Sequence, residues 1–134
     1  MKDCLSSGER LSRVAQEYME AHSAEKFSLE EMADALYVNG SYLLRVFKRY
    51  MGMTPLRYHH VVRCTKAKEL LARPELSISE VGETVGFVSS SHFTHIFRKT
   101  EGCTPTEYRR RTVREVIPAD LRKDDAEGKL AVSG

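Results

Sequence analysis

The sequence predicts an all-α protein in which one long helix joins two helix-turn-helix subdomains. Apolar residues recur at spacings of three, four and seven, which is the period of one helix face. This pattern occurs twice, about 50 residues apart. Residues that favour helix starts (Ser, Asn, Thr-Pro) and helix ends (Gly) stand at matching places in both copies. A chain of 134 residues is long enough to bury one core or two small ones.

A first helix is expected ahead of the repeat. Ser6 and Glu9 have the spacing of a capping box, in which each side chain bonds the backbone N–H of the other residue. The apolar stripe that follows is expected to cover the first copy. It consists of Leu11, Val14, Ala15, Tyr18 and Met19.

The internal repeat spans about 31 residues, with an offset of 49 that becomes 50 after a one-residue insertion. The matching pairs are residues 28–33 with 77–82, 43–48 with 93–98, 52–55 with 102–105, and Tyr58 with Tyr108. Chance rarely preserves apolar positions, caps and a Gly-x-Thr-Pro ending together over such a length. The two copies are therefore expected to share one fold.

Each copy is expected to hold two short helices separated by a tight turn. A capping box starts the first helix, an Asn or Ser N-cap starts the second, and a glycine ends it. These signals are Ser28–Glu31, Asn39 and Gly52 in the first copy, and Ser77–Glu80, Ser89 and Gly102 in the second. The second helices are expected to bury Leu43, Val46, Phe47 and Tyr50, and Phe93, Ile96 and Phe97, with Thr100 at the edge.

A long helix is expected between the copies, from Pro55 to about Ala72, where Arg73-Pro74 ends it. At 1.5 Å per residue it spans roughly 27 Å and is expected to act as a stiff spacer. The predicted organisation is a first subdomain (8–54), the connecting helix (55–73), a second subdomain (74–115) whose last helix starts at Pro105, and a weakly ordered tail (116–134).

Composition excludes several classes of protein. No apolar run approaches the ~18 residues of a membrane span, and no secretory signal follows Met1. The three cysteines, Cys4, Cys64 and Cys103, form no CxxC pair, so free thiols in the cytoplasm are expected rather than disulfides or a cysteine zinc site. The absence of a Gly-rich phosphate loop and of paired acids at helical spacing argues against an enzyme, and no cofactor is expected.

The net charge of +2 conceals an uneven distribution. Residues 1–36 hold 4 basic and 8 acidic residues, residues 37–115 hold 14 and 7, and residues 116–134 hold 3 and 4. A basic middle between acidic flanks favours a polyanionic partner, although a solvated surface gives the same count.

The outward face of each second helix is found by subtracting its buried positions. The residues left are Ser41, Leu44, Arg45 and Lys48, and Ser91, Thr94, His95 and Arg98, with Ser90 beside the helix start. Short hydroxylic side chains let a helix approach base edges, Arg45 can fork onto guanine, and Lys48, Arg49, Arg98 and Lys99 can meet phosphates. Leu44 would touch a thymine methyl or cap the neighbouring helix. His95 would contact a base or act as a structural donor.

Several short motifs in the second copy carry a family resemblance. They are Gly86-Phe87, Ser91-His92-Phe93, Phe97-Arg98-Lys99, Gly102-Cys103-Thr104-Pro105 and Tyr108-Arg109-Arg110. With them, residues 8–112 resemble the DNA-binding domain of the AraC/XylS family of bacterial transcription regulators. The resemblance implies about seven helices, homeodomain-like helix-turn-helix units, and two recognition helices in major-groove segments on one side of the duplex. Carried over by position, it implies base contacts from Ser41, Leu44, Arg45, Ser90, Ser91, Thr94 and His95.

The resemblance also implies partners. These are double-stranded DNA and, as a further candidate, RNA polymerase. Because one chain carries two different recognition helices fixed by the connecting helix, it is expected to bind as a monomer. The family's effector-sensing domain is not in the sequence. The chain is therefore expected to be either a stand-alone regulator, like the small stress-response activators of the family, or the DNA-binding part of a longer chain.

The sequence departs from the family pattern at three places. Tyr37 stands where the first turn often has Gly, so that turn is expected to form without the freedom of positive φ. Gly82 replaces a usual Ala, which keeps close packing but weakens the helix by up to ~1 kcal/mol. Ser90 and His95 stand where Gln and Arg are frequent, so the second recognition helix is expected to discriminate bases less than the first.

The residues allow two alternatives to DNA binding. His92 and His95 at i, i+3 could hold a metal, but no third ligand is evident and His92 aligns with Tyr42, a packing position, so no metal site is expected. A helix-turn-helix module that binds a protein is the stronger alternative, and the basic recognition face argues against it. The sequence therefore predicts a transcription regulator that binds double-stranded DNA sequence-specifically.

Overall fold

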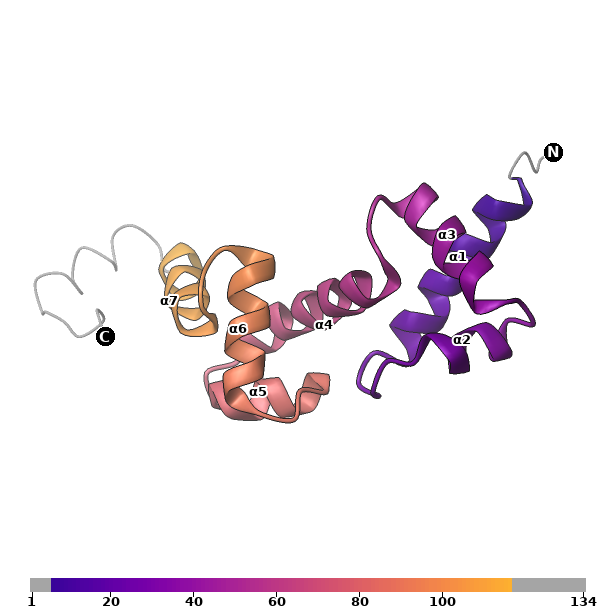
Figure 1. Ribbon diagram of the computed structural model, residues 1–134. Coiled ribbons are helices and arrows are strands. Elements are labelled where there is room, and N and C mark those ends of the chain that lie inside the picture. The colour runs from indigo at the N-terminus through magenta and orange to yellow at the C-terminus, as the bar shows by residue number, and fades with distance from the viewer. Residues whose placement is uncertain (1–5, 117–134) are drawn as a thin grey trace, which may run out of the picture.

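The computed structural model describes residues 6–116, with side chains to residue 112. Seven helices follow one another along this part of the chain, and it contains no strand. They are α1 (Ser7–Ala21), α2 (Leu29–Ala35), α3 (Gly40–Met51), α4 (Pro55–Leu71), α5 (Ile78–Val85), α6 (Ser90–Glu101) and α7 (Pro105–Val116). Figure 1 shows α1–α3 at one end and α5–α7 at the other, with α4 running between them. The predicted all-α fold with two helix-turn-helix subdomains is confirmed.

Two expectations concern the ends and the environment of the chain. The tail that the sequence predicts lies, from residue 117 on, outside the described residues. Among residues 6–116, none of the helices combines the length and the apolar character that crossing a bilayer requires.

The helix ends follow the local signals of the sequence. Complete capping boxes form at Ser6–Glu9 and Ser77–Glu80, N-caps form at Asn39, Thr54 and Ser89, and left-handed glycines end α3 and α6 at Gly52 and Gly102. At α2 the structure forms the serine half of the expected box alone: the Ser28 hydroxyl accepts a hydrogen bond from the Glu31 N–H at 3.1 Å. Each cap satisfies a backbone amide that the first turn of a helix leaves open.

The turns inside the two helix pairs share one backbone geometry. After α2, the Tyr37 N–H bonds the Asp34 carbonyl at 3.1 Å and the Val38 N–H bonds the Ala33 carbonyl at 3.0 Å, which is the Schellman pattern. The equivalent turn after α5 uses Gly86 at φ 114°. The expectation that the first turn avoids a positive φ is wrong, because Tyr37 itself adopts φ 60°. This conformation costs about 1–2 kcal/mol for a residue with a Cβ, and the packing of the helix pair outweighs it.

Each subdomain has its own hydrophobic core. The first contains Ala15, Met19, Met32, Ala33, Leu43 and Phe47. The second contains Cys64, Ala67, Leu71, Val81, Val85, Phe87, Phe93, Ile96, Phe97 and Cys103. Two residues expected inside lie at the surface, Val14 at the edge of the buried stripe of α1 and Tyr50 in the last turn of α3. The Tyr50 ring covers Gly8 of α1, where a Cβ would stand 2.8 Å from Tyr50 Cε2.

Helix α4 is more than the spacer that the sequence predicts. It ends at Leu71, and its 17 residues span about 26 Å. Its C-terminal half gives Cys64, Ala67 and Leu71 to the second core. Near its start, Tyr58 packs edge-on against Phe47 of the first core, with ring centroids 5.6 Å apart. Because α4 belongs to both cores, the two subdomains cannot rotate freely about it.

A buried arginine adds a second connection between the subdomains. Arg63 on α4 is 7% exposed. Its Nε donates to the Ser23 carbonyl at 2.7 Å and its Nη2 to the Glu25 carbonyl at 2.9 Å, both in the segment after α1. Its guanidinium also lies over the ring of Phe87, 5.0 Å from the centroid, in the turn of the second subdomain.

Gly86 makes this close approach possible. A Cβ at Gly86 would stand 2.7 Å from the Ala24 carbonyl oxygen and 2.8 Å from Arg63 Nη2. Glycine therefore both turns the chain after α5 and lets that turn touch the first subdomain. We call this contact the Arg63 junction; it comprises Ser23, Ala24, Glu25, Arg63, Gly86 and Phe87.

Gly82 tests how tightly α5 packs on α6. A Cβ there would lie 2.7 Å from Phe93 Cδ2 and 2.9 Å from its Cγ, and this ring is fully buried. Gly82→Ala should lower the free energy of unfolding by about 1–3 kcal/mol, although alanine favours a helix by ~1 kcal/mol. Gly40→Ala is the matched control, because its Cβ would lie 3.9 Å from Leu29 Cδ2, an ordinary contact. Urea unfolding measures both, and a midpoint raised by Gly82→Ala would contradict the packing argument.

Candidate nucleic-acid interface

The structure places most of the predicted contact residues on the surface of α3 and α6, the second helix of each helix-turn-helix pair and the predicted recognition helices. Exposed on α3 are Ser41, Leu44, Arg45, Lys48 and Arg49, and exposed on α6 are Ser90, Ser91, His95, Arg98 and Lys99. Thr94 is half-buried. Neither helix has an acid in its first turn, and each carries two basic residues in its last turn. We call these two sets of residues the recognition faces.

On α3, an aromatic ring supports the central arginine. The Arg45 guanidinium lies over the ring of Tyr42, 5.4 Å from its centroid, three residues earlier on the same helix. The expectation that Tyr42 and its counterpart His92 are packing positions holds in part: both side chains are exposed, but His92 still packs edge-on against Phe87. The stack limits the conformations of Arg45, so less side-chain entropy is lost when this group binds. Leu44 is 37% exposed, which leaves its methyl groups free for an outside contact.

On α6, two of the predicted base-contacting residues are engaged or partly covered within the protein. The Ser90 hydroxyl lies 2.7 Å from the Ser79 hydroxyl of α5 and is engaged within the protein. With Thr94 half-buried, Ser91 and His95 are the more accessible groups. The expectation that α6 discriminates bases less than α3 stays a prediction.

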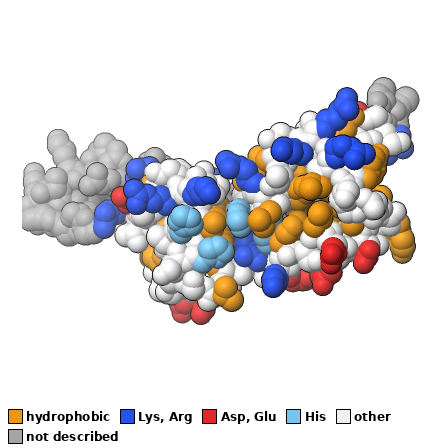
Figure 2. Space-filling model, viewed as in Figure 1, with side chains coloured by type: hydrophobic (Ala, Val, Ile, Leu, Met, Phe, Trp, Pro, Cys, Tyr) orange, Lys and Arg blue, Asp and Glu red, His pale blue; other side chains and the backbone are white. Residues whose placement is uncertain are grey.

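Positive charge extends over both subdomains on one side of the molecule. Figure 2 shows Lys and Arg side chains in a row along one edge of this side, and acidic side chains along the opposite edge, near α2 and α5. Histidines gather over α6 and the middle of α4, beside this row on the side that faces the acidic edge. A rod-shaped polyanion that follows this row would meet both subdomains.

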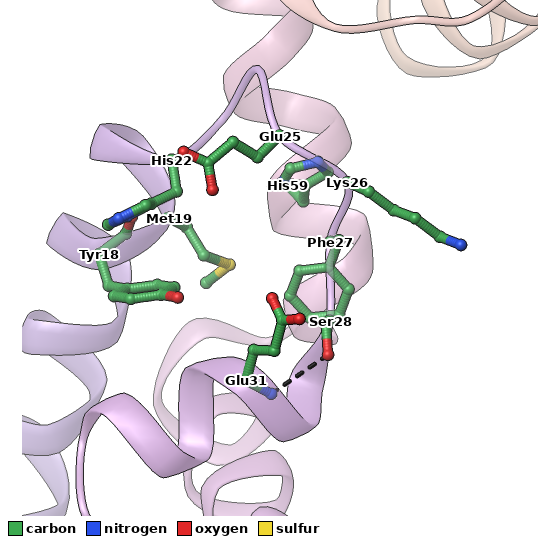
Figure 3. A pocket seen from close by; sticks show the side chains of 9 residues that line it. All are labelled: Tyr18, Met19, His22, Glu25, Lys26, Phe27, Ser28, Glu31 and His59. Atoms are coloured by element: carbon green, nitrogen blue, oxygen red, sulfur yellow. Dashed lines mark hydrogen bonds between the residues drawn. The ribbon is translucent and has the colours of Figure 1, made fainter.

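A small cavity lies where α1, α2 and α4 meet (Figure 3). Its lining is Tyr18, Met19, His22, Glu25, Lys26, Phe27, Ser28, Glu31 and His59. The cavity volume is about 20 Å³, which is the room of a single water, so a small-molecule effector does not fit there. His59 is 3% exposed and its Nε2 has no hydrogen-bond partner. Burial, followed by the charges of Arg63 and His60, lowers the pKa of His59 to about 4.

Comparison with known proteins identifies the family. Residues 32–111 match the family described as "Helix-turn-helix domain". The chain belongs to the AraC-type helix-turn-helix family. It is 33% identical over 111 residues to the uncharacterized HTH-type transcriptional regulator YisR of Bacillus subtilis, a match that covers 83% of this chain and 39% of that protein. The chain spans about two fifths of the length of the curated regulators it matches.

Solved AraC-type structures share the fold. The C-terminal domain of AraT, a response regulator from Geobacillus stearothermophilus, matches with a TM-score of 0.72 and 34% identity over 78% of this chain and 88% of that domain. The DNA-binding domain of AdpA, solved in complex with a target DNA, matches with a TM-score of 0.67 and 28% identity over 73% of this chain and 88% of that chain.

Sequence reasoning missed three residues of this AraC-type domain that the structure brings to the site. Tyr42 supports Arg45, Arg63 joins the subdomains, and His60 on α4 lies against His92 of α6. The sequence holds one indication of the buried Arg63: this cation stands among the apolar positions of α4, between Val62 and Ala67. It holds none for His60, because the neighbour of this residue comes from a helix about 30 residues further along the chain.

The lowered pKa of His59 predicts a pH dependence of stability. Between histidine's ordinary pKa of 6.5 and the value of about 4 in the folded protein, the unfolded chain binds a proton that the folded chain does not. The folded state therefore loses stability as pH falls through this window. His59→Leu should flatten the profile. Urea unfolding at about pH 7, 5.5 and 4.5 measures it, and carboxylates that titrate in both proteins cancel in the comparison. If the stability of the natural protein and of the His59→Leu variant fell equally with pH, groups other than His59 would account for the pH dependence.

Proposed function

We propose that this AraC-type domain is a transcription regulator that binds double-stranded DNA sequence-specifically and contacts two adjacent major-groove segments from one side of the duplex. The observation that carries the proposal is the pair of basic recognition faces, held on one chain by α4 and the Arg63 junction. The DNA complex of the related AdpA domain supports the same class of partner. A protein-binding module has no need for two such faces.

The roles of individual residues follow from their chemistry. On α3, Arg45 forks onto the acceptor edge of a guanine, Ser41 approaches a base edge and Leu44 meets a thymine methyl. On α6, Ser91 and His95 make the corresponding contacts, with Ser90 and Thr94 at their side. Phosphate contacts come from Lys48, Arg49, Arg98 and Lys99.

One chain should suffice for both segments. Successive major-groove faces recur every ~34 Å, or about 10–10.5 base pairs. Helix α4 spans about 26 Å along its axis, so the rest of the distance has to come from how far the exposed faces of α3 and α6 stand away from it. Since the two recognition faces differ, the two half-sites should differ in sequence and the site should not be a palindrome.

Selection of bound sites from random duplexes, followed by a salt titration on the selected site, tests the proposal. Neutralised phosphates give a steep fall of affinity with rising salt. No enriched site, or an affinity that does not depend on salt, would favour the protein-interaction module instead.

Arg45→Ala tests base recognition by α3. The substitution should cost about 1–3 kcal/mol of binding free energy on the selected site and relax the preference at one base pair. Lys48→Ala is the matched control on the same helix, since it should weaken binding to all sequences and reduce the salt slope by about one. If Arg45→Ala lowered the affinity equally for every DNA sequence, Arg45 would contact a phosphate and not a base.

Insertion of about five base pairs between the half-sites tests the two-segment geometry. The insertion turns the second half-site to the far side of the duplex, where a chain locked by α4 and the Arg63 junction cannot follow. Affinity should fall to that of a single half-site and stay there when about ten base pairs are inserted, because that insertion restores the face but adds ~34 Å that a rigid chain cannot span. Unchanged affinity after the shorter insertion, or two chains bound to one site, would contradict the model of a monomer with two contacts.

A further inference from the structure

We propose that His60 and His92 form a binding site for a phosphodiester group of the DNA backbone between the two half-sites, and that this site takes up protons when the phosphate binds. The proposal rests on the proposed function and adds a third contact region to the two recognition faces. The ligand is a backbone phosphate, so the contact carries no sequence information of its own.

The geometry places the two imidazoles together from different helices. His60 of α4 is half-buried and His92 of α6 is exposed. Their ring centroids are 6.3 Å apart, with the rings at 84°. His92 also packs edge-on against Phe87, 5.4 Å away, and Phe87 is held over Arg63. The Arg63 junction therefore fixes the position of this pair.

The surroundings of the pair are cationic. The titratable and charged groups that face His60 are His59 and Arg63 on its own helix and His92 and Lys99 on α6. The side-chain ion pairs found in the described part of the chain, Lys68–Glu101 and Arg73–Glu75, involve none of these groups. Within that part, these cationic groups have no carboxylate among their ion-pair partners, so they create a positive potential that favours the binding of an anion.

Two other ligands fit less well. Residues 6–116 contain no group of three His, Cys, Asp or Glu side chains arranged to hold a metal ion. A free carboxylate or phosphate would find a shallow surface, since His92 is exposed. A duplex that spans both recognition faces has to pass the middle of α4, where Figure 2 shows histidines beside the row of basic side chains. Between successive major grooves the duplex presents its minor groove, which the phosphates border.

Protonation follows from the same contacts. Burial first, and then the charges of His92, Arg63 and Lys99, lower the pKa of His60, so it is neutral near pH 7 in the free protein. A bound phosphate opposes these charges and favours the cationic imidazole. The bound state then holds more protons than the free state, and affinity rises as pH falls. One coupled proton gives at most a tenfold gain per pH unit.

Affinity and proton uptake of the full chain on its selected duplex test the proposal. Binding is measured from about pH 8 to pH 5.5, and calorimetry in buffers of different ionisation enthalpy counts the protons. We expect uptake by the natural protein, less of it in His60→Gln and in His92→Gln, and its loss in the double variant. His22→Gln is the matched control, because His22 stacks on Tyr18 of α1 and its Nδ1 lies 2.8 Å from the Tyr18 carbonyl oxygen. His92→Gln changes an exposed residue and keeps the test valid if the His60 variant folds poorly.

A change in the DNA provides the second arm. Methylphosphonates in place of the central phosphates should abolish proton uptake by the natural protein, while the same change at the ends of the duplex should not. Uptake that persists in the double variant, or that disappears only in His95→Gln, would overturn the proposal while leaving DNA binding intact. Failure of the natural protein to bind any duplex would overturn the proposed function as well.

Discussion

The Arg63 guanidinium is the interaction on which the arrangement of the two subdomains depends. A buried cation is costly unless its donors are satisfied. Here the donors meet the carbonyls of Ser23 and Glu25 just beyond the end of α1, where the helix dipole is negative, and the flat face of the group meets the ring of Phe87. One side chain thus binds the first subdomain, the shared helix and the second subdomain together.

Neighbouring cations on α4 extend this connection. Lys66 Nζ donates to the Glu20 carbonyl at 2.9 Å and to the Ser23 hydroxyl at 2.7 Å. At the other end of α4, Arg109 of α7 donates from Nε to the Leu71 carbonyl at 2.9 Å. Carbonyls left open at the ends of α1 and α4 are therefore satisfied by cations from the following helices. Both subdomains use the same device, although the cations stand at positions that the repeat does not align.

A fixed separation of the recognition helices has a consequence for affinity and specificity. In the proposed complex, two contacts on one rigid chain would lose orientational freedom once, so the second contact would add to affinity at little further entropic cost. The same rigidity ties affinity to the spacing of the half-sites. The consecutive histidines of α4 show how this helix serves two environments: His59 is neutral against the first core, and the next residue lies at the outer face beside α6.

Local sequence by itself determined the helices, their ends and the recognition faces. Caps, Gly-x-Thr-Pro and a 3.6-residue period act within one or two turns of chain, so Asn39, Gly52 and Thr54 could be placed without a fold. Subtraction of buried positions placed Arg45 on the exposed face of α3 for the same reason. The repeat also indicated that the two subdomains share one fold. It could not predict the contacts that only one of them makes.

Tertiary structure alone decided what joins the halves. The bonds of Arg63 reach residues 38 to 40 positions away, and His60 meets His92 across two helices. Tyr37 keeps a left-handed backbone because the packed helices on either side of the turn require it, against its own preference. Tyr50 and Tyr42 lie outside the cores because neighbouring elements, and not the helical period, set the edge of what is buried. Such contacts depend on how separate elements meet, and no local pattern encodes that.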